Sequence, residues 1–193
     1  KKINSDVPII LGGNITRNMR PEKLFEYINI DYVYMGEVEA SFIEFLKYFF
    51  SGLQIDQIPG IAYLNKETNK LIRNGQQRVN LAQIDLMPAY HLLDVEYYIT
   101  TNKHIRFQKL GRVMPMLTGR GCTGGCSFCS PTVGKFIAPS LKNTMNEIKY
   151  LVKNYNFDAF HFITEIFFEF PHEIIEFCKE YKKLNINKKW FCC

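Results

Sequence analysis

Short apolar runs alternate with amphipathic stretches in the carboxyl-terminal part of the chain. The runs predict strands over 113–118, 157–163 and 189–193. Between them, apolar residues at helical spacing predict one helix that begins after Ser140, a favourable N-cap residue, and a second that begins at Pro171. This βαβαβ order implies parallel strands joined by right-handed crossovers. Because three strands alone cannot close a barrel, we expect either an open sheet or further strands beyond these.

The amino-terminal part carries the same alternation over shorter segments. Apolar runs at 7–11 and 32–35 predict buried strands of the kind found in parallel sheets. A helix is predicted to begin at Pro21, and a second to carry phenylalanines at helical spacing over 42–49. We therefore expect the end of an α/β domain here.

Residues 52–110 are less regular. Apolar runs over 61–64 and 71–73 flank a polar tip, as expected of a hairpin, and a proline-containing connector follows. The sequence thus predicts three parts: residues 1–51 as the end of the first α/β domain, residues 52–110 as a linker, and residues 111–193 as the start of a second α/β domain.

Composition excludes several classes of protein. The 193 residues are 47% apolar and 22% charged, close to the globular average, which excludes a disordered tail or a collagen-like repeat. The net charge of +5 is too small for a dedicated nucleic-acid-binding protein. No apolar run approaches the ~20 residues that span a bilayer, and no signal-peptide core is present. We expect a cytoplasmic protein with no nucleic-acid partner and no membrane span.

Both ends of the chain predict an excerpt of a longer protein. The first residue is Lys1 rather than Met, and the last residues, 190–193, form an apolar string typical of a buried strand. Aromatic residues make up 15% of the chain, more ring surface than the visible elements can cover. We therefore expect a piece of an enzyme that does not turn over by itself.

The strongest chemical signal is a group of three cysteines. Cys122, Cys126 and Cys129 have the spacing CxxxCxxC in a glycine-rich loop directly after a predicted strand, where α/β folds place their chemistry. Three thiolates on one loop can bind three irons of a [4Fe–4S] cluster and leave the fourth iron open to another molecule. Half of a zinc site completed elsewhere, or reduced structural thiols, are the alternatives. A disulfide framework is not expected in a cytosolic chain.

This loop, with Phe128 before the last cysteine, resembles the signature of the radical S-adenosylmethionine (radical SAM) family, whose fold is a partial (βα)6 barrel. The resemblance implies that Cys122, Cys126 and Cys129 hold a [4Fe–4S] cluster whose open iron binds S-adenosylmethionine. The cluster would then cleave that molecule reductively to a 5′-deoxyadenosyl radical. An external electron donor such as flavodoxin or ferredoxin is implied as a partner.

The same resemblance assigns roles to residues outside the cysteines. Phe128 would lie near the adenine of S-adenosylmethionine, with a core aromatic as the alternative. Thr164 and Glu165 follow a predicted strand where the family often has acidic residues near the ribose or the amino group, and Glu165 is favoured because Thr164 departs from the usual Asp. His161 is expected to be a hydrogen-bonded structural histidine, facing either the barrel interior or the outer helices. No catalytic residue is assigned.

The amino-terminal segments are similar to the end of the cobalamin-binding domain found upstream of many radical SAM enzymes. Residues 8–13 and 31–39 carry this similarity, and residues 58–63 and 84–88 look like the linker of that class. The implied fold class is α/β: the end of a Rossmann-like cobalamin-binding domain followed by the first half of a partial (βα)6 radical SAM barrel.

This class implies cobalamin as a third cofactor, with Gly12 and Gly13 approaching its tail; a tight turn is the alternative role for these two glycines. The predicted function is therefore that of a radical SAM enzyme that transfers a methyl group, or makes a related modification, on a small-molecule, natural-product or lipid substrate. A radical SAM protein without cobalamin and a zinc-binding interaction module are the alternatives. Cys178, Cys192 and Cys193 are expected to be structural, with Cys178 in the core.

Overall fold

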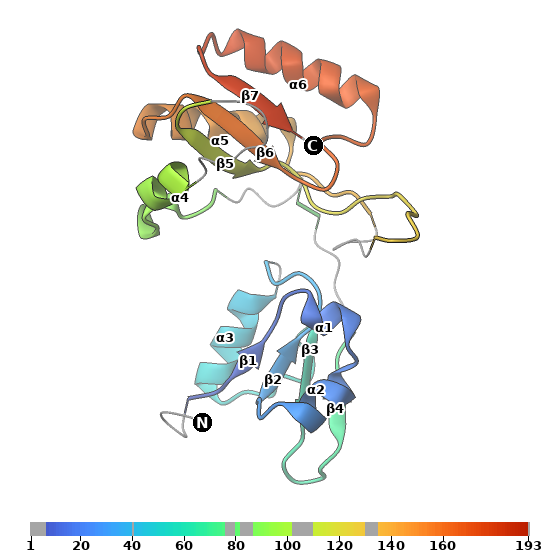
Figure 1. The fold of residues 1–193 in the computed structure, drawn as a ribbon. Helices are drawn as coiled ribbons and strands as arrows, with labels where there is room; N and C mark the ends of the chain where they lie inside the picture. The colour runs from blue at the N-terminus through green and yellow to red at the C-terminus, as the bar shows by residue number, and fades with distance from the viewer. Residues whose placement is uncertain are drawn as a thin grey trace. The chain divides into compact units, whose positions relative to one another are not determined.

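The computed structural model describes residues 7–39, 41–75, 80–81, 87–101, 110–129 and 135–192, without the side chains of Arg17, Thr100 and Thr101. The chain divides into two compact units, Lys1–Val79 and Asn80–Cys193. Both mix helices with strands, and both contain parallel strand pairs (Figure 1). The mixed α/β class expected from the sequence is therefore confirmed. In the part of the chain that is described, no helix has the length and apolar character needed to cross a membrane.

The first unit is built on a four-stranded sheet in the order β1-β2-β3-β4. Its strands are β1 (Ile10–Leu11), β2 (Tyr32–Tyr34), β3 (Ile61–Leu64) and β4 (Leu71–Arg73). The pair β1–β2 is parallel, whereas β2–β3 and β3–β4 are antiparallel. The short helix α1 (Ile15–Asn18) and α2 (Pro21–Tyr27) lie between β1 and β2 in the chain, and α3 (Phe42–Ser51) follows β2.

Two small hydrophobic cores hold the first unit together. Phe45 of α3 is buried with Tyr34 and Ile61 of the sheet, while Leu24 of α2 is buried with Val33. Alternate residues of β2 thus enter different cores, as the period of two in a strand requires. The helix α3 ends at Gly52, whose backbone has the left-handed conformation that favours glycine at this position.

The hairpin β3–β4 belongs to the sheet of the first unit. The sequence assigned it to the linker 52–110, but Tyr34 pairs with Ile61 and the ladder continues into β4. Within the first unit, the Asn74 side chain also donates to the backbone oxygens of Ile55 and Ile58. The boundaries of the domains in the whole protein stay a prediction, and residues 82–86 of the linker motif lie outside the described residues.

The second unit contains a three-stranded parallel sheet in the order β5-β6-β7, as predicted. The strands are β5 (Val113–Leu117), β6 (Ala159–Ile163) and β7 (Lys189–Cys192). The crossover helices are α5 (Leu141–Asn154) and α6 (Pro171–Lys183), and the unpredicted η1 (Tyr90–Leu92) and α4 (Val95–Thr101) precede the sheet. Figure 1 shows α5 and α6 beside the strands.

One hydrophobic core joins this sheet to its helices. Met114, Met116, Phe160 and Phe162 are buried with side chains from α4, α5 and α6, and Trp190 and Cys192 pack against them. The helix residues are Val95, Ile99, Met145, Ile148, Leu151, Phe177 and Tyr181. Because side chains alternate along a strand, the residues between these strand positions face the other side of the sheet.

The sequence predicted correctly where α5 and α6 begin, but it assigned the wrong face of α6 to the core. The Ser140 hydroxyl accepts a hydrogen bond from the Asn143 amide, so it caps α5 as predicted. Cys178, however, is exposed rather than in the core. Phe177 and Tyr181 are the buried residues of α6, and Cys178 lies one residue, about 100°, around the helix from Phe177. Cys193 lies outside the described residues.

Candidate functional site

The three cysteines lie on a loop that leaves the carboxyl end of β5. We call residues 118–129 the cysteine loop. Its base is closed by Arg120 and Ile137, whose backbones form an antiparallel bridge with N···O distances of 2.8 and 2.9 Å. The ring of Phe136 lies against Gly119, where the Cβ of any other residue would sit 2.6 Å from a ring carbon. The sequence did not predict this closure, because Phe136 and Ile137 carry no motif.

Two of the cysteine sulfurs lie around Gly124. A Cβ at residue 124 would be 3.2 Å from the Sγ of Cys122 and 3.8 Å from the Sγ of Cys126, so both sulfurs surround the space that glycine leaves open. The Gly124 amide donates to the Cys122 sulfur at 3.2 Å. Cys122 is half-buried, whereas Cys126 and Cys129 are exposed. This glycine therefore lets two thiols and a backbone donor gather on one side of the loop.

The cysteine loop is held to the next strand by Glu165. The amide of Gly121, which has a positive φ of 84°, donates to Oε2 of Glu165 at 2.9 Å. Glu165 follows β6, so the bond joins the carboxyl ends of two neighbouring parallel strands. Thr164, the adjacent candidate, instead donates its hydroxyl hydrogen to the backbone oxygen of Ile166 at 2.8 Å. Of these two, Glu165 is therefore the one bonded to the cysteine loop.

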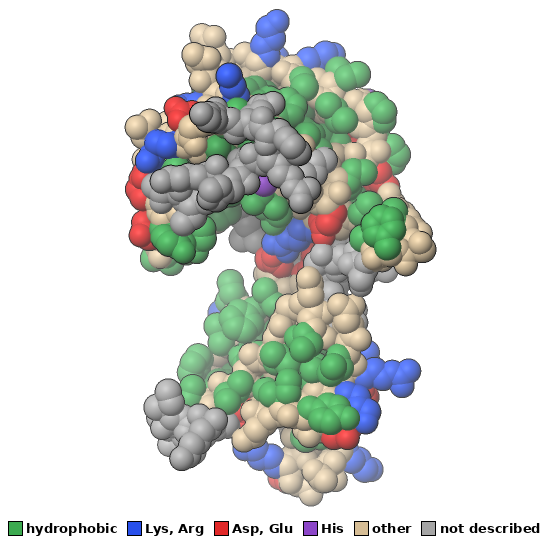
Figure 2. Space-filling view, in the orientation of Figure 1, with side chains coloured by type: hydrophobic (Ala, Val, Ile, Leu, Met, Phe, Trp, Pro, Cys, Tyr) green, Lys and Arg blue, Asp and Glu red, His purple; other side chains and the backbone are tan. Residues whose placement is uncertain are grey.

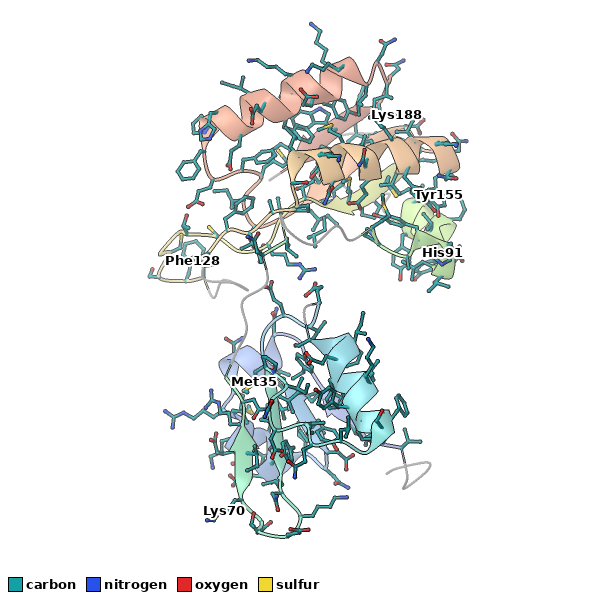
Figure 3. The ribbon with its side chains drawn as sticks, turned by 180° about the vertical axis from the view of Figure 1, so that it is seen from behind. Met35, Lys70, His91, Phe128, Tyr155 and Lys188 are labelled. Carbon is teal, nitrogen blue, oxygen red and sulfur yellow. The ribbon has the colours of Figure 1, made fainter. Side chains whose placement is uncertain are left out.

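Phe128 and His161 differ from the structural alternatives considered for them. Phe128 is 92% exposed and projects from the loop (Figure 3), so the core-aromatic interpretation is wrong. His161 was expected to be hydrogen-bonded, but among the described residues its buried Nδ1 has no hydrogen-bond partner. Its ring stacks on Phe191 at 4.3 Å between centroids. Burial lowers the pKa of His161 below its ordinary value of 6.5, which favours the neutral imidazole near neutral pH.

A second set of candidate residues lies in the first unit, where β1 and β2 end side by side. Gly13 after β1 and Gly36 after β2 have positive φ angles of 88° and 91°. The buried hydroxyl of Thr16 donates to the backbone oxygens of Gly13 and Tyr34, so it ties the two loops together. An added Cβ at Gly13 would meet nothing within 4 Å, and one at Gly12 only the Tyr34 Cβ at 4.0 Å. The backbone of Gly12 and Gly13 is therefore exposed at this edge of the sheet.

The chemistry of the cysteine loop fits an iron–sulfur cluster, although the described residues do not form a finished metal site. No three His, Cys, Asp or Glu side chains meet closely enough in the described part of the chain to hold a metal ion. Cys122 and Cys126 already converge at Gly124, and Cys129 is exposed on the same loop.

Comparison with known proteins finds relatives among methyltransferases and a cyclase. No protein-family profile matches the chain. The chain is 25% identical, over 78% of its length, to the cytidylyl-2-hydroxyethylphosphonate methyltransferase of Streptomyces wedmorensis. It is 27% identical, over 98% of its length, to an uncharacterized methyltransferase of Pyrococcus horikoshii. It is 26% identical, also over 98%, to the anaerobic magnesium-protoporphyrin IX monomethyl ester cyclase of Rubrivivax gelatinosus.

Solved structures with a similar fold include cobalamin-dependent radical SAM enzymes. The enzyme OxsB, solved with aqua-cobalamin and S-adenosylmethionine, matches 94% of the chain with a TM-score of 0.71 at 22% identity. The radical SAM methyltransferase TsrM of Kitasatospora setae matches 93% with a TM-score of 0.63 at 19% identity. These matches confirm, at the level of the fold, the resemblance inferred from the sequence.

The chain spans only part of each of these proteins. It covers 33%, 40% and 34% of the three relatives, and 25% of OxsB and 33% of TsrM. The similarity thus runs through nearly all of this chain but through a minority of each longer protein.

Proposed function

We propose that the chain is part of a cobalamin-dependent radical SAM enzyme that transfers a methyl group or makes a related radical modification. The observation that carries this proposal is the cysteine loop at the carboxyl end of β5, in a fold shared with enzymes of that class. Cys122, Cys126 and Cys129 would hold a [4Fe–4S] cluster.

In this proposal the first unit belongs to a cobalamin-binding domain and the second to a radical SAM barrel. The first unit contributes the end of a Rossmann-like cobalamin-binding domain, supported by the parallel pair β1–β2 and by the open backbone at Gly12 and Gly13. The second contributes the first half of a partial (βα)6 barrel, supported by its parallel strands and crossover helices.

The residues of the second unit would bind and orient the cofactors. The Gly124 amide, which already donates to the Cys122 sulfur, would stabilise that sulfur as a thiolate. Oε2 of Glu165 accepts from Gly121, and a carboxylate has about four lone-pair sites, so Glu165 can also accept from the ammonium group of S-adenosylmethionine. The exposed ring of Phe128 would lie along the adenine.

When bound, the cluster supplies the electron that cleaves S-adenosylmethionine to methionine and a 5′-deoxyadenosyl radical. The chain's own part is to place the cysteine sulfurs, hold the amino group through Glu165 and keep the loop against the sheet edge. The electron would come from an external donor such as flavodoxin or ferredoxin.

Lys and Arg side chains are scattered over the face in Figure 2. The absence of a nucleic-acid partner stays a prediction from the net charge.

The decisive experiment is anaerobic reconstitution of the full-length protein with iron and sulfide. We expect a brown protein that absorbs in the visible charge-transfer region, with about four irons and about four sulfides per chain. Its reduced form should give a paramagnetic signal that changes when S-adenosylmethionine is added. Binding of cobalamin is tested separately, by the cobalamin content of the same protein after purification with the vitamin present.

Matched cysteine variants assign the ligands. Replacing Cys122, Cys126 and Cys129 together by Ala should abolish the colour, whereas Cys178→Ala, at an exposed cysteine on α6, should leave it unchanged. A colourless protein that holds one zinc would overturn the enzyme proposal in favour of a zinc-binding module. Loss of colour in Cys178→Ala would overturn the ligand assignment. A cluster without cobalamin would leave a radical SAM enzyme of the cobalamin-independent kind.

A further inference from the structure

A groove lies between α5 and α6 on the surface of the second unit. The two helices pack side by side next to the sheet (Figure 3). The groove has a volume of about 520 Å³, and its lining comes from α5, from the end of α6 and from the turn before β7. We call it the helix groove. Its size is within the range of sites that bind other molecules.

The floor of the helix groove is apolar. Met145 is buried in the core of the second unit, and Val152, Leu184 and Ile186 are half-buried and pack against the same core. Because these side chains belong to the core, close packing fixes the shape of the floor. Apolar side chains of another molecule would gain free energy by leaving water and covering it.

Lysines stand on both walls of the helix groove. Lys149 and Lys153 are exposed and lie about 6 Å apart along the axis of α5. Lys183 lies on the opposite wall, on α6, where it pairs with Glu180 at 2.5 Å. Within the described residues, neither Lys149 nor Lys153 forms a salt bridge. These two ammonium groups are therefore available to the carboxylates of another molecule.

An apolar floor between cationic walls complements an acidic amphipathic helix. A helix that docks in a groove places apolar residues at i, i+3, i+4 and i+7 on the floor. Carboxylates beside that apolar stripe would then face the lysines. The part of α5 from Met145 to Lys153 is about 12 Å long, which matches about two turns of a docked helix. A small anion with one charged group would leave most of these cations without a partner.

The helix groove lies away from the cysteine loop. Lys153 and Ile186 come shortly before β6 and β7, at the amino ends of these parallel strands, whereas the cysteine loop leaves the carboxyl end of β5. Figure 3 shows Tyr155 and Lys188, near the same amino ends, across the unit from Phe128. A molecule bound in the helix groove would therefore leave the cysteine loop open.

We propose that the helix groove is the docking site for an acidic amphipathic helix of a partner protein. The apolar stripe of that helix packs on the floor, and its carboxylates pair with Lys149 and Lys153. The two lysines give the preference for an acidic partner, and the floor gives the preference for an apolar stripe. This inference goes beyond the function proposed above and does not depend on it.

The test measures peptide binding to the full-length protein by fluorescence anisotropy. The probe is a fluorescein-labelled peptide of about 18 residues, about five helical turns, with a leucine stripe flanked on both sides by glutamates. A second peptide has lysine in place of every glutamate. A third has the composition of the first, with the leucines scattered around the helix. The buffer contains about 0.05 M salt, so that charge pairs are only weakly screened.

Two double variants locate the binding site. Lys149→Glu with Lys153→Glu reverses the charges on one wall of the helix groove. Lys179→Glu with Lys182→Glu is the matched control, because these lysines are exposed on α6 and do not line the groove. Both double variants change the net charge by the same amount, so any difference between them reports the place of the charges.

The proposal predicts a specific pattern of binding. Wild type should bind the acidic amphipathic peptide with a Kd below about 100 μM, and at least about tenfold more tightly than the other two peptides. The groove variant should bind it at least about tenfold more weakly, because two attractions become repulsions. The control variant should stay within about twofold of wild type. Iron incorporation and consumption of S-adenosylmethionine should be the same in all three proteins.

Each other result overturns a defined part of the argument. Equal weakening in the two double variants would show attraction by net charge alone, and equal binding of the scattered peptide would show that the floor takes no part. No binding by wild type would overturn the docking site. Displacement of the peptide by decanoate would assign the groove to a small amphiphilic anion and overturn the partner class. Failure of wild type to assemble a cluster would instead overturn the proposed function and leave the docking site standing.

Discussion

Replacing Glu165 by Ala should loosen the cysteine loop without unfolding the protein. The loop is tied to the end of β6 by the bond from the Gly121 amide to Oε2 of Glu165, with an N···O distance of 2.9 Å. Gly121 is buried, so leaving its amide unpaired costs free energy. Removing the carboxylate therefore leaves this amide without its partner.

The size of the effect follows from the surroundings of the bond. A hydrogen bond to a charged group contributes about 1.5–3 kcal/mol when both partners are shielded from water. Glu165 is itself exposed, so water replaces part of the lost interaction, and we expect about 1 kcal/mol for Glu165→Ala. Glu165→Gln keeps a carbonyl oxygen as acceptor but loses the charge, and should cost roughly half as much.

Hydrogen exchange measures this change directly. In the cluster-free protein, the amide of Gly121 should exchange about fivefold faster in Glu165→Ala, and less than that in Glu165→Gln, as followed by mass spectrometry on peptides covering the cysteine loop. Glu176→Ala, at an exposed glutamate on α6, is the control and should change nothing. If Gly121 exchanged at the same rate in wild type and Glu165→Ala, the bond would not hold the loop and this reasoning would be refuted.

Three further predictions concern stability and loop geometry. Burial raises the pKa of Glu147, and the hydrogen bond from Tyr90 opposes this increase only in part. The protonated Glu147 therefore stabilises the fold fully below about pH 4.3, the ordinary pKa of a glutamate. This stabilisation is lost as the pH rises through the pKa of Glu147 in the folded protein. Denaturant unfolding should therefore show Glu147→Gln gaining stability relative to wild type as the pH is raised above the ordinary pKa of a glutamate. Ser140→Ala removes the N-cap of α5 and should lower the free energy of unfolding by about 1 kcal/mol. Gly119→Ala should displace the Phe136 ring, which would have atoms 2.6 Å from the new Cβ, and lower iron incorporation compared with Gly125→Ala, where an added Cβ meets nothing within 4 Å.

The sequence predicted the strands and the helix starts of the second unit because their signals are local. The run that became β5 is apolar and bounded by glycines, and Ser140 and Pro171 stand where helices begin. The parallel order followed from the alternation of strands and helices. With the order known, the placement of the cysteine loop at the carboxyl edge of the sheet followed as well.

The features that the sequence did not predict depend on contacts between residues far apart in the chain. Cys178 was assigned to the core, yet the packing of α6 buries Phe177 and Tyr181 and leaves Cys178 exposed. The sequence did not predict η1 and α4, although Val95 and Ile99 have the i, i+4 spacing of a helix and both are buried in the core of the second unit. Propensity and periodicity do not specify such partners.

The contact between Gly121 and Glu165 shows how topology produces a site that neither segment encodes alone. The two residues are 44 positions apart, but α5 returns the chain from the end of β5 to the start of β6, so both strands end at the same edge. The segment after β6 therefore brings Glu165 to Gly121, whereas Thr164 bonds to Ile166 instead. A carboxylate at this place can hold the loop with one lone pair and accept from an ammonium group with others. Ligand binding and loop order would then be linked through one side chain, and each should strengthen the other by the same factor.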